Sequence, residues 1–237
     1  MSKSAVILAG GLGTRLKPFT EVVPKPLLPI GEKSLLEIQI TRLKNHGFDR
    51  VFLATNYMSD YIQGFFGDGS RYGVRLEISQ ETTPLGTVGP ITLLKDQLTE
   101  PFVLLNGDIL STIDFTRFYN FALTLPADLC VAIKTIITPF DFGTILYEGD
   151  YVTEIKEKPD FQVDVLAGIY VFKPGIFRLI PDNEYFGMDT LIKKMLAEGI
   201  PVAKYYMEEY WLDIGMLPDY QKAQKAYETH FKDEMER

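Results

Sequence analysis

A glycine-rich turn after the first apolar segment has the composition of a phosphate-binding loop. Residues 5–9 read Ala-Val-Ile-Leu-Ala, and Gly-Gly-Leu-Gly-Thr-Arg follows at 10–15. Glycine lets the backbone approach a ligand where a Cβ would clash, and consecutive backbone N–H groups in such a turn attract anions. Arg15 and Lys25, the latter within Pro-Lys-Pro-Leu at 24–27, could contact the same phosphates as fixed positive charges.

Two better-known glycine motifs do not fit this segment. A Walker A loop needs Lys and then Ser or Thr directly after its last glycine, whereas Thr14 and Arg15 follow Gly13. The dinucleotide-binding fingerprint needs a third glycine, and Leu16 stands at that position counted from Gly11. A glycine-rich turn with only a structural role is the other interpretation. The order of glycines, Arg15 and a Pro-Lys-Pro segment after one strand favours the phosphate loop.

Two aspartates are candidate ligands for a metal ion. Asp108 closes the segment Leu-Asn-Gly-Asp at 105–108, where a carboxylate could hold a cation over bound phosphates. Oxygen ligands beside a triphosphate indicate Mg²⁺, which takes only one or two protein carboxylates. Asp213 lies between apolar residues in Trp-Leu-Asp-Ile-Gly at 211–215, and a buried carboxylate needs a partner. The alternatives are an Asp108 that caps the next turn and an Asp213 that pairs with a basic side chain.

Two polar segments could contact the rest of a substrate. Glu157 could accept hydrogen bonds from sugar hydroxyls, and Lys158 could neutralise a phosphate, although composition alone favours a solvated charge cluster there. Gln80 ends a strand-like run before Pro-Leu-Gly-Thr at 84–87, where an amide could read the edge of a base. The alternative for that segment is a helix start reached through a proline turn.

The segment Gly-Gly-x-Gly-Thr-Arg-Leu-x-Pro-x-Thr at 10–20, followed by Pro-Lys-Pro-Leu at 24–27, resembles the signature of the sugar-phosphate nucleotidylyltransferases. The resemblance implies a Rossmann-like, glycosyltransferase-A-like fold and Mg²⁺ as cofactor. It also implies a reaction in which a sugar 1-phosphate and a nucleoside triphosphate give a nucleotide-sugar and pyrophosphate. Asp108 and Asp213 match two aspartates that jointly hold the metal in that family. The segment after Gly215 departs from the family pattern, because Met-Leu-Pro stands where Thr or Arg and then Pro are usual.

The resemblance also assigns the other site residues. It makes Arg15 and Lys25 the catalytic cations, with Lys25 nearest the reacting α phosphate. The nucleotide-binding residues that it implies are Leu8, Ala9, Gly10, Gly11, Gly13, Thr14, Gln80, Gly86 and Asn106. The sugar-phosphate-binding residues that it implies are Gly143, Glu157, Lys158 and Tyr170.

The base and the sugar are less well indicated than the reaction. The segments at 24–27 and 80–87 are most similar to guanylyltransferases that act on mannose or heptose 1-phosphate. Enzymes that use UTP, CTP or dTTP, and a phosphocholine-type cytidylyltransferase, are alternatives within the same chemistry. A non-catalytic subunit that senses nucleotide-sugars is another, although such a subunit should have lost the loop cations or the metal carboxylates. A nicotinamide oxidoreductase is disfavoured by the missing third glycine.

These candidate residues require a scaffold in which several strands end at one edge. The apolar patterns predict strands at 5–9, 51–54, 74–79, 102–105 and 128–134, with helices at 34–45, 59–66, 86–96 and 114–123. This alternation predicts an α/β fold with a doubly wound, mostly parallel sheet that binds ligands beyond the carboxyl ends of its strands.

The second half of the chain changes character. Strands predicted at 143–147, 151–156 and 165–172 have short connections, which indicates a small antiparallel insertion. Helices at 174–179, 189–198 and 218–232 and a strand at 202–207 complete the pattern. We expect one nucleotidyltransferase domain over 1–237, with a nucleotide-binding half at 1–134 and a sugar-binding half with the terminal helix at 135–237.

Composition restricts the partners and the compartment. The 237 residues include 24 basic and 32 acidic side chains, for a net charge of −8, which argues against nucleic-acid and anionic-membrane partners. No apolar run approaches the roughly 18 residues of a membrane span. The single cysteine, Cys130, excludes an internal disulfide, and residues 1–4 show no signal peptide. We expect a cytoplasmic protein, with a homodimer as a candidate assembly.

Overall fold

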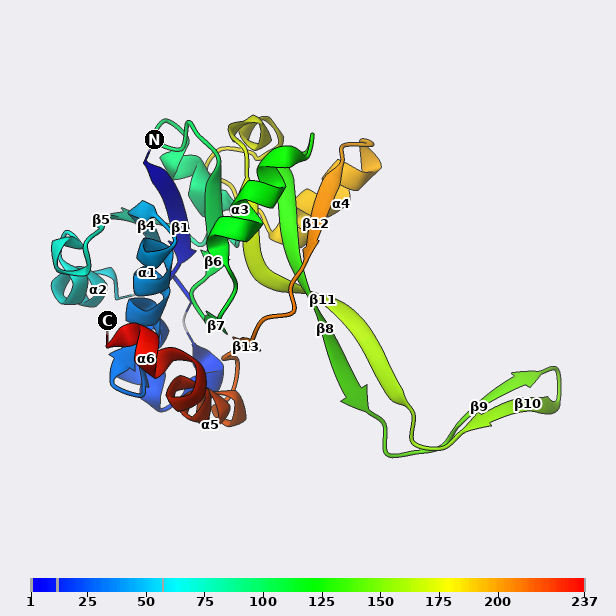
Figure 1. Cartoon of the computed structure of the whole chain (residues 1–237). Coiled ribbons are helices and arrows are strands. Elements are labelled where there is room, and N and C mark those ends of the chain that lie inside the picture. The colour runs from blue at the N-terminus through cyan, green and yellow to red at the C-terminus, as the bar shows by residue number, and fades with distance from the viewer. Residues whose placement is uncertain (1, 12, 57, 237) are drawn as a thin grey trace.

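A seven-stranded sheet in the order β12-β8-β11-β6-β1-β4-β5 forms the centre of the protein (Figure 1). The computed structural model describes residues 2–11, 13–56 and 58–236. The strands are β1 (Lys3–Leu8), β4 (Phe48–Thr55), β5 (Arg75–Gln80), β6 (Phe102–Asn106), β8 (Leu129–Pro139), β11 (Asp160–Phe172) and β12 (Val202–Tyr206). Neighbours β1–β4, β1–β6, β4–β5 and β8–β12 are parallel, whereas β11 runs antiparallel to β6 and β8. The predicted mostly parallel α/β sheet is confirmed.

Helices cover both faces of this sheet. Consecutive strand residues point to opposite sides, so apolar side chains on each face need their own cover. Ala5 and Ile7 of β1 pack in one core cluster with α1 (Leu35–Asn45), α2 (Ser59–Phe66) and α3 (Phe115–Thr124). Val6 packs in a second cluster with α4 (Met188–Ala197). The sheet is therefore doubly wound, as the alternation of strands and helices predicts. No helix within residues 2–11, 13–56 and 58–236 has the length and apolar character that a membrane span requires.

Three of the predicted helices take other forms. The segment predicted as a helix at 86–96 holds a short 3₁₀ helix (Gly89–Leu94), and another 3₁₀ helix spans Pro174–Leu179. Gly86 has a φ of 82°, which a right-handed helix excludes, and prolines in the first turn remove N–H donors. The predicted terminal helix at 218–232 is divided into α5 (Leu217–Ala226), a π-helical turn (Tyr227–Phe231) and α6 (Lys232–Met235).

Short strand pairs that were not predicted connect distant parts of the chain. β2 (Pro29–Ile30) pairs with β3 (Lys33–Ser34), and β7 (Ile109–Ser111) pairs with β13 (Trp211–Asp213). Two or three residues are too few for an alternating pattern to stand out in a sequence. The β7–β13 pair brings the segment after β6 against a segment that lies about a hundred positions further along the chain.

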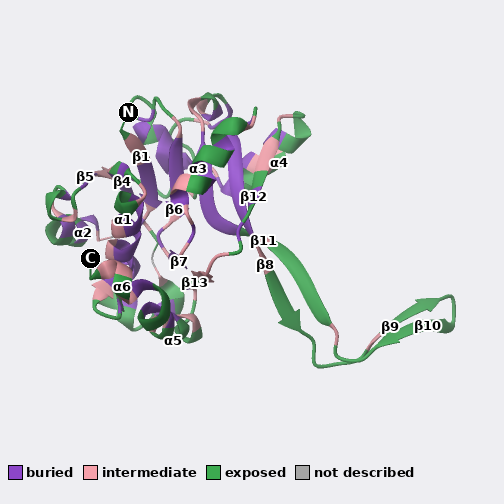
Figure 2. Ribbon diagram, in the orientation of Figure 1, coloured by how far each residue is buried: buried purple, intermediate pink, exposed green. Residues whose placement is uncertain are grey.

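β8 and β11 continue out of the sheet as a two-stranded arm, and the hairpin of β9 (Thr144–Glu148) and β10 (Tyr151–Lys156) lies at its end (Figure 1). We call residues 134–166 the ribbon. The pairing shifts register between Leu166 and Tyr170, where Gly168 has a φ of 70°, and such a bulge bends a strand. The ribbon confirms the predicted antiparallel insertion, and Figure 2 shows that it is exposed along most of its length.

Candidate active site

A cavity of about 530 Å³ lies beyond the carboxyl ends of the central strands. Leu8 ends β1, Ala54 is the next-to-last residue of β4, and Asn106 ends β6, and all three line the cavity. Ligands of doubly wound sheets bind at this edge, and the volume lies within the roughly 300–1,000 Å³ of small-molecule sites. The position therefore agrees with the site that the sequence predicts.

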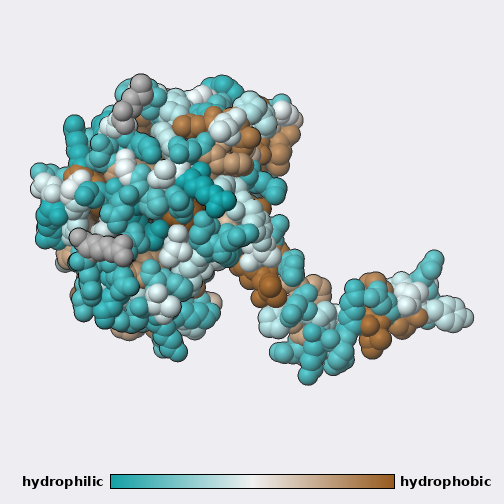
Figure 3. Space-filling model, viewed as in Figure 1, coloured by the Kyte–Doolittle hydropathy of each residue, from teal (hydrophilic) through white to brown (hydrophobic). Residues whose placement is uncertain are grey.

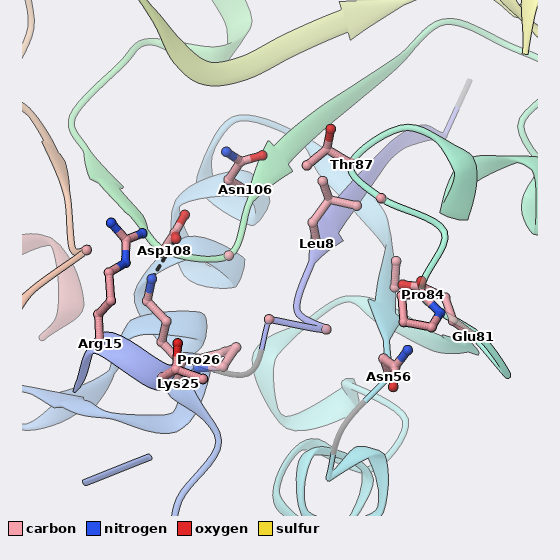
Figure 4. Close-up of a pocket in the computed structure, with 18 of the residues that line it drawn as sticks. Leu8, Arg15, Lys25, Pro26, Asn56, Glu81, Pro84, Thr87, Asn106 and Asp108 are labelled. Atoms are coloured by element: carbon pink, nitrogen blue, oxygen red, sulfur yellow. Dashed lines mark hydrogen bonds and ion pairs between the residues drawn. The ribbon is translucent and has the colours of Figure 1, made fainter. Parts of the chain in front are cut away.

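The two ends of the cavity differ in chemistry (Figure 4). Arg15, Lys25 and Asp108 lie at one end, and Asn56, Glu81 and Pro84 lie at the other. The remaining lining residues are Leu8, Gly10, Gly11, Gly13, Thr14, Pro26, Ala54, Gly86, Thr87, Asn106, Gly107, Tyr185 and Gly215. One end thus offers cations beside a carboxylate, and the other offers a carboxylate among small and apolar groups.

Glycines allow the two central loops to pack closely. Gly13 has a φ of 59°, and a Cβ on it would lie 2.8 Å from Cγ2 of Thr20, whose hydroxyl donates to the Gly13 carbonyl at 2.8 Å. A Cβ on Gly107 would lie 2.4 Å from the carbonyl oxygen of Leu8, which accepts a hydrogen bond from the Gly107 N–H at 2.9 Å. Side chains at these positions would push the loops apart, so the backbone borders the cavity here.

Lys25 and Asp108 form an ion pair at the charged end of the cavity. Lys25 begins a 3₁₀ helix (Lys25–Leu27) between two prolines, and only 8% of it is exposed. Its Nζ lies 2.6 Å from Oδ2 of Asp108. Burial of an ammonium requires a compensating partner, and Asp108 supplies it. The pair presents a positive and a negative charge to one ligand.

Asp213 lies beside Asp108 through the β7–β13 pair. Asp213 is opposite Ile109 in that pair, and the N–H of Ile214 donates to the carbonyl of Asp108 at 3.0 Å. Partial loss of surrounding water, and then the nearby Asp108 carboxylate, raise the pKa of Asp213. No cluster of three His, Cys, Asp or Glu residues that could hold a metal occurs among the described residues. The pair nevertheless fits Mg²⁺, which accepts two carboxylates and completes its shell with water and phosphate.

Glu81 places a buried carboxylate at the opposite end. It follows β5 directly, is 8% exposed, and its Oε2 accepts a hydrogen bond from the Leu85 N–H at 2.8 Å. Burial raises the pKa of the Glu81 carboxyl, and that hydrogen bond opposes the rise. Its Oε1 lies 3.4 Å from the position that a Cβ on Gly10 would take. The second oxygen thus lies against the glycine loop, at the end of the cavity that Glu81 lines.

Asn106 lies between the two ends (Figure 4). Its backbone carbonyl accepts a hydrogen bond from the Gln39 amide at 3.0 Å. Within residues 2–11, 13–56 and 58–236, nothing donates to its buried side-chain oxygen Oδ1. A buried acceptor without a partner is costly.

Most of the residues predicted for the nucleotide and for catalysis line this one cavity: Leu8, Gly10, Gly11, Gly13, Thr14, Arg15, Lys25, Gly86, Asn106 and Asp108. Ala9 does not line it, because it is buried behind the loop, where its N–H donates to the Ala54 carbonyl at 2.7 Å. Tyr170 is likewise buried, and burial raises the pKa of its hydroxyl to about 12. Gln80 is exposed, and the adjacent Glu81 lines the cavity instead.

Three residues predicted for the sugar phosphate lie elsewhere. Gly143, Glu157 and Lys158 all belong to the exposed ribbon and do not line the cavity. A Cβ on Gly143 would lie 3.0 Å from Oε2 of Glu157, so these two residues are neighbours within the ribbon. The structure therefore places Gly143 and Glu157 beside each other, but it places neither of them on the cavity that the glycine loop lines.

Several lining residues were not predicted, and some carried a usable signal. Asn56 directly follows β4, so the rule that ligands bind beyond strand ends would have found it. Glu81 is adjacent to Gln80, and only the direction of each side chain separates them. Tyr185 comes from the segment before α4, and no sequence pattern connects it with the glycine loop.

Comparison with known proteins agrees with this geometry. The family described as nucleotidyl transferase matches residues 4–230. A probable mannose-1-phosphate guanylyltransferase 1 of Oryza sativa subsp. japonica is 33% identical over 232 residues, covering 94% of this chain and 64% of that protein. The D-glycero-alpha-D-manno-heptose 1-phosphate guanylyltransferase of Aneurinibacillus thermoaerophilus is 34% identical over 234 residues, covering 95% of this chain and 99% of that protein. The chain thus spans slightly less than two thirds of the first relative and nearly all of the second.

A solved structure shares the fold. HddC from Yersinia pseudotuberculosis aligns with a TM-score of 0.74 and 27% identity, covering 95% of this chain and 99% of that one. The same protein has also been solved complexed with GMP-PN. The match over residues 4–230 and the full-length bacterial relative confirm the resemblance noted in the sequence. This chain belongs to the nucleotidyl transferase family and is similar to its sugar-phosphate nucleotidylyltransferases.

Proposed function

We propose that this protein transfers a nucleotidyl group from GTP to mannose or heptose 1-phosphate and releases pyrophosphate. The observation that carries this proposal is the cavity itself, which has the Lys25–Asp108 ion pair and Arg15 at one end and the Glu81 carboxylate at the other. A nucleoside triphosphate also differs between its two ends, with anionic phosphates at one end and a hydrogen-bonding base at the other. Relatives named for mannose and heptose 1-phosphate support the choice of sugar.

The reaction would be a displacement at the α phosphorus. An oxygen of the sugar phosphate forms a new bond to that phosphorus, and the bond to the bridging oxygen of pyrophosphate breaks. The attacking oxygen is already ionised at neutral pH, so the site needs no general base. Catalysis then consists of positioning and charge neutralisation. The glycine loop and Arg15 would hold the leaving pyrophosphate, and Lys25 would offset the repulsion between the two anions.

Asp108 and Asp213 would hold Mg²⁺ at the same end. Loss of surrounding water and the nearby Asp108 charge raise the pKa of Asp213, and a cation bound by both carboxylates would oppose this rise. When bound, the ion would supply positive charge to the phosphate oxygens in the transition state. Lys25 holds Asp108 in place through their ion pair, so it would also orient one ligand of the metal.

Glu81 supports guanine as the base. The Watson–Crick edge of guanine presents two adjacent donors, N1–H and the N2 amino group, and a carboxylate is an acceptor for both. Uracil and thymine present carbonyl oxygens on both sides of their single N–H, and a carboxylate would repel these oxygens. Glu81 lines the cavity, where one of its oxygens accepts a hydrogen bond from the Leu85 N–H and the other lies beside Gly10. HddC, which has been solved with GMP-PN, agrees with this choice.

Gly143, Glu157 and Lys158 keep the sugar-phosphate role that the family resemblance assigns to them. All three lie on the exposed ribbon and outside the cavity. This role therefore requires the ribbon to lie over the cavity when the sugar phosphate is bound. Lys158 would then neutralise the sugar phosphate, and Glu157 would accept hydrogen bonds from sugar hydroxyls.

The test is pyrophosphate release in the presence of Mg²⁺. GTP, UTP, CTP, dTTP and ATP are each combined with mannose, heptose and glucose 1-phosphates and with phosphocholine. We expect release only with GTP and one of the first two sugars, and loss of release in Asp108→Ala. Release with another nucleotide would retain the reaction class and refute the choice of base. Nucleotide binding without release from any pair would refute the transferase and favour a sensing subunit.

A further inference from the structure

Gln39 is a buried amide on α1 that the proposed reaction does not use. It lies between Ile38 and Ile40 in the middle of the helix, and only 4% of it is exposed. Figure 3 shows a mainly hydrophilic surface over the part of the molecule where α1 lies, and the apolar side chains of α1 pack toward the sheet. A buried amide is unfavourable unless its hydrogen bonds are satisfied, so the bonds that Gln39 makes indicate its role.

Both hydrogen bonds of the Gln39 amide go to one turn. Its Nε2 donates to the carbonyl of Asn106 at 3.0 Å and to the carbonyl of Ile109 at 2.8 Å. Asn106 ends β6 and Ile109 begins β7, so the turn between them consists of Gly107 and Asp108. With the amide reversed, its oxygen would face two carbonyl oxygens, so the turn permits only this orientation. A single side chain thus holds both ends of the turn that carries Asp108.

Other contacts hold the same turn from the sheet and from the cavity. The Gly107 N–H donates to the last carbonyl of β1 at 2.9 Å, and the Asp108 carbonyl accepts a hydrogen bond from the Ile214 N–H at 3.0 Å. The Asp108 carboxylate pairs with Lys25 at 2.6 Å. Gln39 adds a contact from α1, and this contact fixes both ends of the turn at once. The direction of the Asp108 carboxylate therefore depends on α1 as well as on the sheet.

We propose that Gln39 is a positioning residue, which acts through this turn to direct the Asp108 carboxylate toward the metal that Asp108 and Asp213 would hold. Gln39 itself does not line the cavity. The inference rests on the metal site of the proposed function, but it does not depend on which nucleotide or sugar reacts. Residues that orient metal ligands without touching the metal contribute about 10- to 100-fold to metal affinity or activity. Without the two bonds from Gln39, the turn could rotate and Asp108 would leave the position that it shares with Asp213.

The first experiment measures metal binding in the absence of substrate. Mn²⁺ accepts the same oxygen ligands as Mg²⁺, and the electron paramagnetic resonance signal of the free ion reports how much of it is unbound. Gln39→Met keeps an unbranched side chain of similar length but removes the hydrogen-bond donor. We expect the Kd for Mn²⁺ to rise about tenfold or more in this variant.

Arg42→Met is the matched control on the same helix. Arg42 is also buried, donates to the carbonyl of Ile113 at 3.0 Å and pairs with Glu234 at 2.7 Å. Its loss should lower the Tm, because it breaks a largely buried ion pair. Ile113 lies beyond β7, so the Kd for Mn²⁺ in Arg42→Met should match that of wild type.

Gln39→Asn is a second variant that keeps the amide on a side chain one methylene shorter. This amide cannot reach both carbonyl oxygens within hydrogen-bond distance unless the backbone shifts. It should therefore also bind Mn²⁺ more weakly than wild type, and it tests the proposal even if Gln39→Met does not fold. Circular dichroism would verify the fold of each variant.

A second experiment uses the reaction itself. The Mg²⁺ concentration that gives half of the maximal rate of pyrophosphate release should rise about tenfold or more in Gln39→Met. The KM for the sugar 1-phosphate should not change, because Gln39 acts on the metal ligand and does not line the cavity. A side chain that only packs the core would lower the Tm without raising this Mg²⁺ requirement.

Three results would overturn the proposal. One is an equal Kd for Mn²⁺ in wild type, Gln39→Met and Gln39→Asn. Another is a Kd raised equally in Gln39→Met and Arg42→Met, which would show a general loss of packing. The third is a wild type that binds no Mn²⁺, which would refute the metal site as well. A wild type that binds Mn²⁺ but releases no pyrophosphate would refute the transferase, and a higher Kd in Gln39→Met would then still support the role of Gln39.

Discussion

Nζ of Lys25 lies 2.6 Å from Oδ2 of Asp108, although 83 positions separate the two residues in the chain. This ion pair joins the segment after the glycine loop to the carboxyl end of β6. It places a buried cation and a carboxylate at one end of the same cavity. A substrate that binds there must satisfy both charges, as a triphosphate with a divalent cation does.

Lys25→Met should lower kcat for pyrophosphate release on the order of 100-fold or more, because it removes a cation placed against developing negative charge. It also leaves Asp108 without its partner. Lys17→Met is the control, since Lys17 lies on the same segment but is exposed and forms an ion pair with Glu21. Equal kcat values for Lys25→Met and wild type would rule out a catalytic role for this lysine.

Arg15→Ala should lower turnover on the order of 100-fold if Arg15 holds the leaving pyrophosphate. Inhibition by added pyrophosphate should weaken together with turnover, since the same contact binds the product. Arg71→Ala, on an exposed 3₁₀ helix (Ser70–Tyr72), is the control. A variant that keeps both wild-type turnover and wild-type pyrophosphate inhibition would contradict the assignment.

Glu81→Gln should reduce kcat/KM for GTP by about 10- to 100-fold, because one charged acceptor for the guanine edge becomes a neutral amide. The ratio of kcat/KM for GTP to kcat/KM for UTP should also fall. Gln80→Ala is an informative comparison, since Gln80 was the predicted base contact but is exposed outside the cavity. If Gln80→Ala has the larger effect on the GTP preference, Glu81 is not the residue that reads the base.

Asp213→Asn should stabilise the metal-free protein at neutral pH. The raised pKa means that the folded state binds this proton more tightly than the unfolded chain does. From the ordinary value of 3.8 up to the raised value, stability therefore falls as pH rises. Thermal unfolding should show a higher Tm for the variant at pH 7, with the difference disappearing as the pH falls below about 3.8. A variant less stable than wild type at neutral pH would contradict this.

Mg²⁺ should raise the Tm of wild type, because a ligand that binds only the folded state stabilises it. The increase should be much smaller in Asp213→Asn and in Asp108→Asn, each of which retains a single carboxylate. Asp219→Asn is the control. Asp219 lies on α5, and its Oδ2 accepts a hydrogen bond from the Met216 N–H at 3.1 Å. The same increase in all four proteins would place the ion elsewhere.

Lys158→Ala should raise the KM for the sugar 1-phosphate by about tenfold, the effect of one lost charge-assisted hydrogen bond, and leave the KM for GTP unchanged. Lys156→Ala is the control, because Lys156 is exposed on the same ribbon, where its Nζ lies 3.3 Å from Oε1 of Glu154. A rise in both KM values would indicate a general effect on the fold, and no rise would remove Lys158 from the sugar site.

The alternation of strands and helices was readable in the sequence because burial repeats with the period of each element. Residues 102–105 are continuously apolar, and they form the interior of β6 within the sheet. The glycine loop and Lys25 were readable for a different reason. Glycines and prolines restrict the backbone locally, so their effect does not depend on distant residues. The charged end of the cavity was therefore largely predictable.

Tertiary structure alone decided the rest, because it depends on pairing between distant segments and on the direction of single side chains. The family resemblance had matched Asp213 and Asp108 to one site, but the β13–β7 pair that brings them together leaves no pattern in the sequence, because each strand has only three residues. Glu81 faces the cavity while Gln80 does not, because adjacent residues at a strand end point to opposite sides. The ribbon carries Glu157 and Lys158 away from the cavity, because the bulge at Gly168 bends β11 out of the sheet. Local composition determines which elements form, and the packing between them determines which side chains meet.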